Sequence, residues 1–153
     1  MSYPTILFVE DSEDDTRVIR LGFQRAGFAL PLNFVTDGVC AVEYLTGKGQ
    51  YSDRLKFPVP CVLLTDLKMP RMNGFELLKW VRTHPDWHLL PVLVITNSNQ
   101  TEDRQKAMDL GADFYVMKDL LMKPPPAFIE ALSRYATPLW TRARAPAPAR
   151  AQI

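Results

Sequence analysis

The residues best suited to chemistry in this sequence each come directly after a short apolar run. Glu10 and Asp11 follow the run TILFV, and Asp66 follows CVLLT. Thr96 follows PVLVI, and Lys118 follows DFYVM. Such β-branched and apolar runs are typical of strands buried on both faces of a parallel sheet. One acid after a strand is often only a turn residue. Ligands bind beyond the carboxyl ends of parallel strands, so the four positions together predict one site.

The acids of this set indicate a divalent cation. Two carboxylates about 4 Å apart repel by about 4 kcal/mol at an effective dielectric near 20. Either one of Glu10, Asp11 and Asp66 is protonated, or a cation lies among them. Mg²⁺ suits carboxylates, because it takes one or two of them and leaves room for a phosphate. No His or Cys is placed to form a zinc site.

A carboxylate next to Mg²⁺ can act as a nucleophile toward a phosphoryl group. Lys118 would supply a mobile positive charge for one phosphoryl oxygen, and the Thr96 hydroxyl would bond another. The alternatives are that Lys118 is a solvated strand end and that Thr96 is an ordinary β-branched strand residue. The occurrence of the whole set at four strand ends favours the chemical interpretation.

The elements that must position these residues alternate along the chain. Strands are predicted at 5–9, 30–35, 61–65, 91–95 and 113–117, and a helical pattern follows each of them. Ser12 with Asp15 three residues later is a capping-box pattern, and Asn73 is a predicted N-cap. This (βα)5 pattern predicts an α/β fold: a doubly wound, five-stranded parallel sheet of flavodoxin-like order 2-1-3-4-5.

The overall composition is that of an ordinary globular protein. The chain has 153 residues, 47% apolar and 23% charged, with a net charge of +1, which favours neither nucleic acid nor membrane partners. Cys40 and Cys61 are expected to be reduced thiols of a cytoplasmic protein. No segment has the length and hydrophobicity of a bilayer span.

Together, Glu10-Asp11, Asp66 in DLKMPRMNG, Thr96 in VITNS and Lys118 resemble the receiver domain of two-component response regulators. The resemblance covers roughly residues 2–135. It implies a receiver domain over 1–137, followed by a Pro/Ala/Arg-rich and mostly disordered tail over 138–153.

What the resemblance implies for the site is specific. Asp66 would accept a phosphoryl group from the phosphohistidine of a sensor histidine kinase. Glu10, Asp11, Asp66 and the backbone carbonyl of Lys68 would hold Mg²⁺.

The resemblance also implies a pair of switch residues. Thr96 would move toward the phosphoryl group, and Tyr115 would turn inward behind it. The alternative for Tyr115 is a plain aromatic residue of the fifth strand.

The sequence departs from the family pattern after Lys118, where receivers usually have proline and this chain has Asp119. A cis bond before a residue other than proline is costly, so a trans loop is expected, with an extra carboxylate close to Lys118. A subset of receivers lacks this proline, including single-domain regulators paired with phytochromes. That subset is also similar in its long segment before the third strand, here 47–60.

The function expected from these features is that of a single-domain response regulator, a signalling protein rather than an enzyme. Its output would come from protein contacts of its own surface, on the face of the fourth helix, fifth strand and fifth helix, where a homodimer could form. The segment Leu120–Met122 would either add an exposed apolar contact or pack under the last helix.

Two alternatives stay open. An Mg²⁺-dependent phosphatase or phosphotransferase would carry a general acid two residues after its nucleophilic Asp, where this chain has Lys68. A pseudo-receiver scaffold would need no phosphorylation, and Asp119 keeps that interpretation open.

Overall fold

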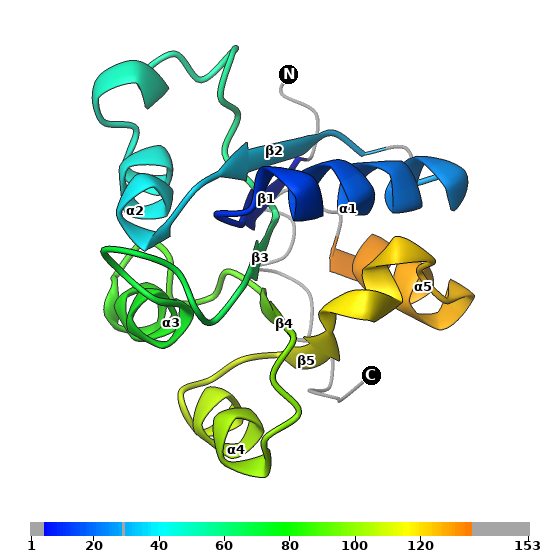
Figure 1. The fold of residues 1–153 in the computed structure, drawn as a ribbon. Helices are drawn as coiled ribbons and strands as arrows, with labels where there is room; N and C mark the ends of the chain where they lie inside the picture. Colours follow the sequence, from blue (N-terminus) through cyan, green and yellow to red (C-terminus); the bar gives the residue numbers. More distant parts are fainter. Residues whose placement is uncertain (1–4, 29, 136–153) are drawn as a thin grey trace.

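The computed structural model describes residues 5–28 and 30–135, which form a parallel five-stranded sheet with helices on both faces (Figure 1). The strands are β1 (Ile6–Val9), β2 (Leu32–Val35), β3 (Val62–Thr65), β4 (Val92–Thr96) and β5 (Phe114–Met117). Their order is β2-β1-β3-β4-β5, as the sequence predicted. Val9 pairs with both Val35 and Thr65, so β1 and β3 end side by side. This register brings the residues that follow the two strands next to each other.

One α-helix follows each strand in the described residues, and the bounds are α1 (Glu13–Arg25), α2 (Gly38–Thr46), α3 (Gly74–Thr83), α4 (Thr101–Asp109) and α5 (Pro126–Tyr135). Helices α1 and α5 cover one face of the sheet, and α2, α3 and α4 cover the other (Figure 1). Ser12, Asp37 and Asn73 each accept a hydrogen bond from the backbone N–H three residues later, which fixes where α1, α2 and α3 begin.

The sheet separates two apolar cores, because successive side chains of a strand point to opposite faces. Phe8 of β1 packs with α1 and α5, whereas its neighbour Leu7 packs with α2 and α3. Both side chains are completely buried, and full burial of such a side chain contributes about 1.5–3 kcal/mol. The strand ends therefore extend from a rigid, close-packed sheet.

The long segment between α2 and β3 is packed against the body. It contains the short 3₁₀ helix η1 (Gly49–Tyr51), and Tyr51 and Phe57 lie with ring centroids 5.1 and 5.9 Å from that of Tyr44. The Arg54 guanidinium donates to the carbonyls of Tyr44 and Leu45 at 2.8 and 2.7 Å. Both carbonyls lie in the last turn of α2, where regular helical hydrogen bonding ends, so Arg54 ties the segment to this end of the helix.

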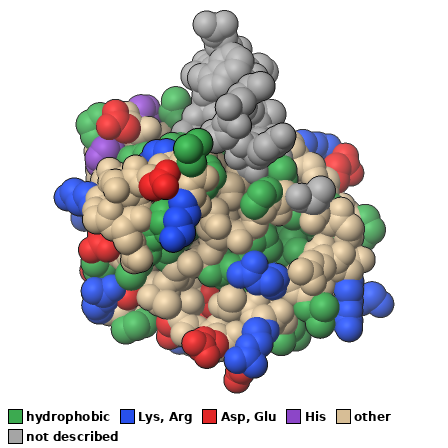
Figure 2. Space-filling view, turned by 90° about the horizontal axis from the view of Figure 1, so that it is seen from above, with side chains coloured by type: hydrophobic (Ala, Val, Ile, Leu, Met, Phe, Trp, Pro, Cys, Tyr) green, Lys and Arg blue, Asp and Glu red, His purple; other side chains and the backbone are tan. Residues whose placement is uncertain are grey.

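The predicted boundary at 137/138 and the tail over 138–153 lie outside the described residues and stay predictions. Within 5–28 and 30–135, no helix combines the length and hydrophobicity that crossing a bilayer requires. In the view of Figure 2, Lys and Arg side chains alternate with Asp and Glu across the coloured surface.

Candidate functional site

Asp66 lies where β3 ends, held by its neighbours in a buried position. Its N–H donates to the Val9 carbonyl at 3.1 Å, and its Oδ1 accepts from the Leu67 N–H at 2.7 Å. Gly74, the first residue of α3, is required here, because a Cβ at that position would lie 2.2 Å from the Asp66 carbonyl oxygen. The side chain is only 9% exposed, so this carboxylate has a fixed direction and little water around it.

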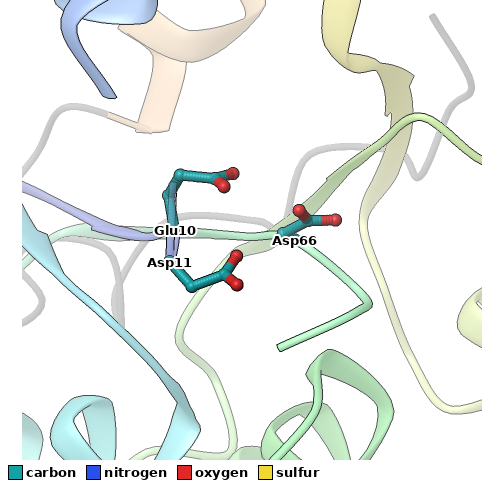
Figure 3. A group of neighbouring side chains, drawn as sticks. All are labelled: Glu10, Asp11 and Asp66. Atoms are coloured by element: carbon teal, nitrogen blue, oxygen red, sulfur yellow. The ribbon is translucent and has the colours of Figure 1, made fainter. Parts of the chain in front are cut away.

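Glu10, Asp11 and Asp66 form an acidic cluster at the adjacent ends of β1 and β3 (Figure 3). One carboxylate oxygen from each lies within 4.8 Å of the others; Glu10 and Asp66 are buried and Asp11 is exposed. Burial, with the charge of Asp66 added to it, raises the pKa of Glu10 to about 7, although the adjacent Lys118 ammonium opposes this shift. Ionisation of Glu10 in the folded protein therefore costs more free energy than ionisation of a carboxyl group in water.

The cluster fits a hard divalent cation. It offers only carboxylate oxygens, the ligands that Mg²⁺ and Ca²⁺ prefer. Glu10 Oε2 is fully buried and makes no well-directed hydrogen bond, although Lys118 Nζ lies 2.9 Å from it. A bound cation would satisfy this oxygen and lower the repulsion between the acids.

Lys118 reaches the same place from the end of β5, with its side chain 5% exposed. Its Nζ lies 2.8 Å from Asp66 Oδ2, 2.9 Å from Glu10 Oε2 and 3.0 Å from Asp15 Oδ2. The contact with Glu10 is an ion pair without the direction of a hydrogen bond. Although burial lowers the pKa of Lys118, bonds to the three carboxylates hold it above its usual range, so the side chain is an ammonium ion.

Asp15 is the site residue that the sequence analysis missed, since it was interpreted only as part of a capping box. The Ser12 side chain does accept from the Asp15 N–H, at 3.2 Å. The Ser12 N–H, however, donates to Glu10 Oε1, and the Asp15 carboxylate points to Lys118 instead of completing the box. The available signal was a fourth carboxylate in the first turn of the helix that starts at this edge.

Thr96 and Lys68 line a pocket of about 310 Å³ beside Asp66, together with residues 97–100. The Thr96 Oγ1 accepts from the Ser98 N–H at 3.1 Å, and Thr96 is buried. Lys68 follows Asp66 by two residues and its side chain is exposed. The pocket is open to small molecules or to a partner's side chain, and Asp66 forms part of its wall.

Tyr115 of β5 already lies inside the protein, with 1% of its surface exposed. Its hydroxyl donates to the Ser98 carbonyl at 2.9 Å, and the Arg104 guanidinium lies 5.4 Å from the ring centroid. Burial raises the pKa of this phenol. The inward position expected of a switched state is thus compatible with the unmodified chain, and the movement itself stays a prediction.

The loop after Lys118 differs in part from expectation. No described peptide bond is cis, as predicted, and a 3₁₀ helix, η2 (Lys118–Met122), follows β5 directly. The expectation that Asp119 supplies the extra carboxylate near Lys118 is wrong, because Asp119 is exposed and Asp15 makes that contact. Of the apolar residues that follow, Leu121 is fully buried, whereas Leu120 and Met122 remain partly exposed.

A flavodoxin-like sheet with clustered acids and an ammonium group at its carboxyl edge defines an α/β domain suited to phosphoryl chemistry. The family model described as "Response regulator receiver domain" matches residues 6–124. The chain therefore belongs to the response regulator receiver domain family.

The chain is similar to regulators of about its own size. "Response regulator Rcp1" of Synechocystis sp. is 30% identical over 118 residues, which are 77% of this chain and 78% of that protein. A response regulator in red light signalling of R. palustris superposes with a TM-score of 0.71 at 28% identity, covering 86% and 90% of the two chains. The bacteriophytochrome response regulator RtBRR gives a TM-score of 0.68 at 31% identity, covering 88% and 91%.

Membership of this family has two consequences. Response regulators receive their signal from histidine kinases, so the chain has a kinase of this type as its partner. Receiver domains are generally signalling proteins rather than enzymes.

Proposed function

We propose that Asp66 accepts a phosphoryl group from a phosphohistidine of a sensor histidine kinase, in a reaction that requires Mg²⁺. The observation that carries this proposal is the position of the Asp66 carboxylate. It belongs to the acidic cluster, lies 2.8 Å from the Lys118 ammonium and forms part of the wall of an open pocket of about 310 Å³. A carboxylate so placed can reach a donor in the pocket while groups on either side neutralise charge.

The residues have separate tasks in this transfer. The Leu67 N–H holds Asp66 Oδ1 and so orients the carboxylate. An oxygen of Asp66 attacks phosphorus, the P–N bond to the donor histidine breaks, and its electron pair stays on the imidazole. Lys118 moves from Asp66 to an oxygen of the transferred group, and Thr96 donates its hydroxyl to another oxygen.

Mg²⁺ would be held by Glu10, Asp11, Asp66 and the backbone carbonyl of Lys68. When bound, it supplies positive charge to the phosphoryl oxygens during transfer. The cluster of carboxylate oxygens within 4.8 Å supports the first three ligands, and so does the buried Glu10 Oε2 without a directed hydrogen bond. The Lys68 carbonyl follows from the family resemblance.

Thr96 and Tyr115 form the proposed switch. Movement of Thr96 toward the phosphoryl group would draw the 97–100 loop with it, and the Tyr115 hydroxyl is bonded to Ser98 in that loop. Phosphorylation would then change the surface over α4, β5 and α5, the face that we propose for output and for a homodimer.

The product of this transfer is the protein phosphorylated on Asp66, which would lose its phosphate only by slow hydrolysis. A phosphatase of the alternative class needs an aspartate as general acid two residues after its nucleophile. In this chain that position is occupied by Lys68, which has no carboxyl group. The pseudo-receiver alternative rested on Asp119 as a carboxylate close to Lys118. Because Asp119 is exposed to solvent, we favour phosphorylation over this alternative. At most slow self-dephosphorylation is expected.

The relatives support a narrower assignment. Similarity to regulators named for red light signalling and for bacteriophytochromes makes a phytochrome kinase the proposed donor. The missing proline after Lys118, a feature of the subset that includes phytochrome-paired receivers, also supports it. We place the protein in the cytoplasm, without nucleic acid or membrane partners, in line with its net charge of +1.

Incubation with acetyl phosphate and Mg²⁺ tests the proposal. Intact-protein mass spectrometry should find one added phosphoryl group, which EDTA and Asp66→Asn both abolish. Asp53→Asn removes an exposed aspartate of the segment between α2 and β3, outside the acidic cluster, and should leave the modification unchanged. An unmodified wild type, or equal modification of Asp66→Asn, contradicts the proposal. Steady phosphate release from generic substrates would instead support the phosphatase.

A further inference from the structure

Helix α1 and the segment after β5 are joined at the site by one ion pair. The Asp15 carboxylate lies 3.0 Å from Lys118 Nζ, across 103 positions of sequence, and its side chain is 31% exposed. Asp15 is available for this contact because the Ser12 N–H is bonded to Glu10 rather than to Asp15. The Asp15 carboxylate therefore accepts from Lys118, whereas the Asp15 N–H donates to the side chain of Ser12, the N-cap of the helix.

The two segments are also held in register below this pair. A Cβ on Gly22 of α1 would lie 2.2 Å from the Leu121 carbonyl oxygen, so the helix and η2 are in direct backbone contact. Leu121 is fully buried, which fixes η2 against the core. Packing of α1 against η2 thus keeps the first turn of the helix within reach of the Lys118 side chain.

Asp15 differs from the other two acids around Lys118 in one respect. Glu10 and Asp66 belong to the acidic cluster that fits a cation, and Asp66 is also the proposed phospho-acceptor. A cation or a phosphoryl group would draw their oxygens away from Lys118. Asp15 lies outside the cluster, so neither event would compete for its oxygens.

We propose that Asp15 is a positioning residue, which holds the Lys118 ammonium at the site while Glu10 and Asp66 are engaged elsewhere. A lysine has three donors and a flexible four-carbon stem, so it can bind Asp15 and a phosphoryl oxygen at once. The inference rests on the proposed function, because it assumes that Lys118 acts on the phosphoryl group.

Phosphorylation kinetics of position 15 variants test this role. With acetyl phosphate and saturating Mg²⁺, Asp15→Asn should be phosphorylated about tenfold more slowly, as is typical when an outer-shell partner is removed. Asp15→Glu should recover most of the rate, because it restores the carboxylate. Asp14→Asn is the matched control, since Asp14 is an exposed acid in the same helical turn. It should react at the wild-type rate.

A double-mutant cycle in EDTA provides a readout independent of activity. Asp15→Asn should lower the urea midpoint of the wild type and leave that of Lys118→Met unchanged, because the pair is already broken there. An equal shift in both backgrounds would mean that Asp15 only supports the helix. A wild-type rate, a faster rate, or an equal loss in Asp14→Asn would also overturn the inference. If the wild type itself is not phosphorylated, the proposed function fails instead.

Discussion

The raised pKa of Glu10 predicts that metal binding depends on pH in the physiological range. Mg²⁺ needs the ionised carboxylate, and the pKa of Glu10 is about 7. About one tenth of this group is then ionised at pH 6 and about nine tenths at pH 8. The apparent affinity for Mg²⁺ should therefore rise about tenfold between these two pH values.

Isothermal titration calorimetry at pH 6, 7 and 8, repeated in buffers of different ionisation enthalpy, measures both the affinity and the protons released. The expected release approaches one proton per Mg²⁺ at pH 6 and falls toward zero at pH 8. Glu10→Gln should bind Mg²⁺ more weakly and lose most of this pH dependence. Equal affinities at pH 6 and pH 8, or an unchanged dependence in Glu10→Gln, would refute the reasoning.

The same shift has a consequence for stability in the absence of metal. Because the folded protein holds the Glu10 proton more tightly than the unfolded chain, folding is favoured most below the ordinary pKa of 4.5. This contribution to the free energy of unfolding is lost as pH rises through about 7. A shift of about 2.5 pKa units corresponds to at most about 3 kcal/mol. Urea denaturation in EDTA should show this decline, and Mg²⁺ should reverse it.

Other consequences concern single contacts. Lys118→Met should lower the free energy of unfolding in EDTA by about 3 kcal/mol, because it leaves buried acids unpaired. The same variant should bind Mg²⁺ more tightly, and calorimetry showing weaker binding would contradict this. Gly74→Ala should cost about 1–3 kcal/mol, since its Cβ meets the Asp66 carbonyl, and unchanged urea stability would count against that contact. Tyr115→Phe should cost about 1 kcal/mol through its bond to Ser98, measured as a lower thermal midpoint; an equal midpoint would disprove that contribution.

The part of this protein that the sequence predicts well is the part fixed by short-range pattern. Buried parallel strands consist of continuous apolar runs, so the ends of β1 and β3 could be located within one residue. Parallel topology then brought Glu10 and Asp66 to one edge, and the pairing of Val9 with Thr65 follows the same logic. The order of the strands depended on the handedness of the crossovers, which is nearly invariant.

What the sequence did not predict depends on side-chain direction in the folded chain. Asp15 has the spacing of a capping box, and only the nearby bond from Ser12 to Glu10 explains why its carboxylate turns to Lys118. Asp119 adjoins Lys118 in sequence, yet the 3₁₀ turn carries it to the surface. Both errors have one cause. The groups that contact Lys118 come from other elements at the sheet edge, and distance along the sequence does not identify them.

The most direct test of the central claim identifies the modified atom. Wild-type protein phosphorylated by a histidine kinase with ATP and Mg²⁺, then treated with borohydride, has any aspartyl phosphate reduced to homoserine. Peptide mass spectrometry should find homoserine at position 66 and nowhere else, and none in samples prepared with EDTA. Homoserine at another aspartate, or its absence from position 66 after every kinase that transfers phosphate to the protein, would contradict the account.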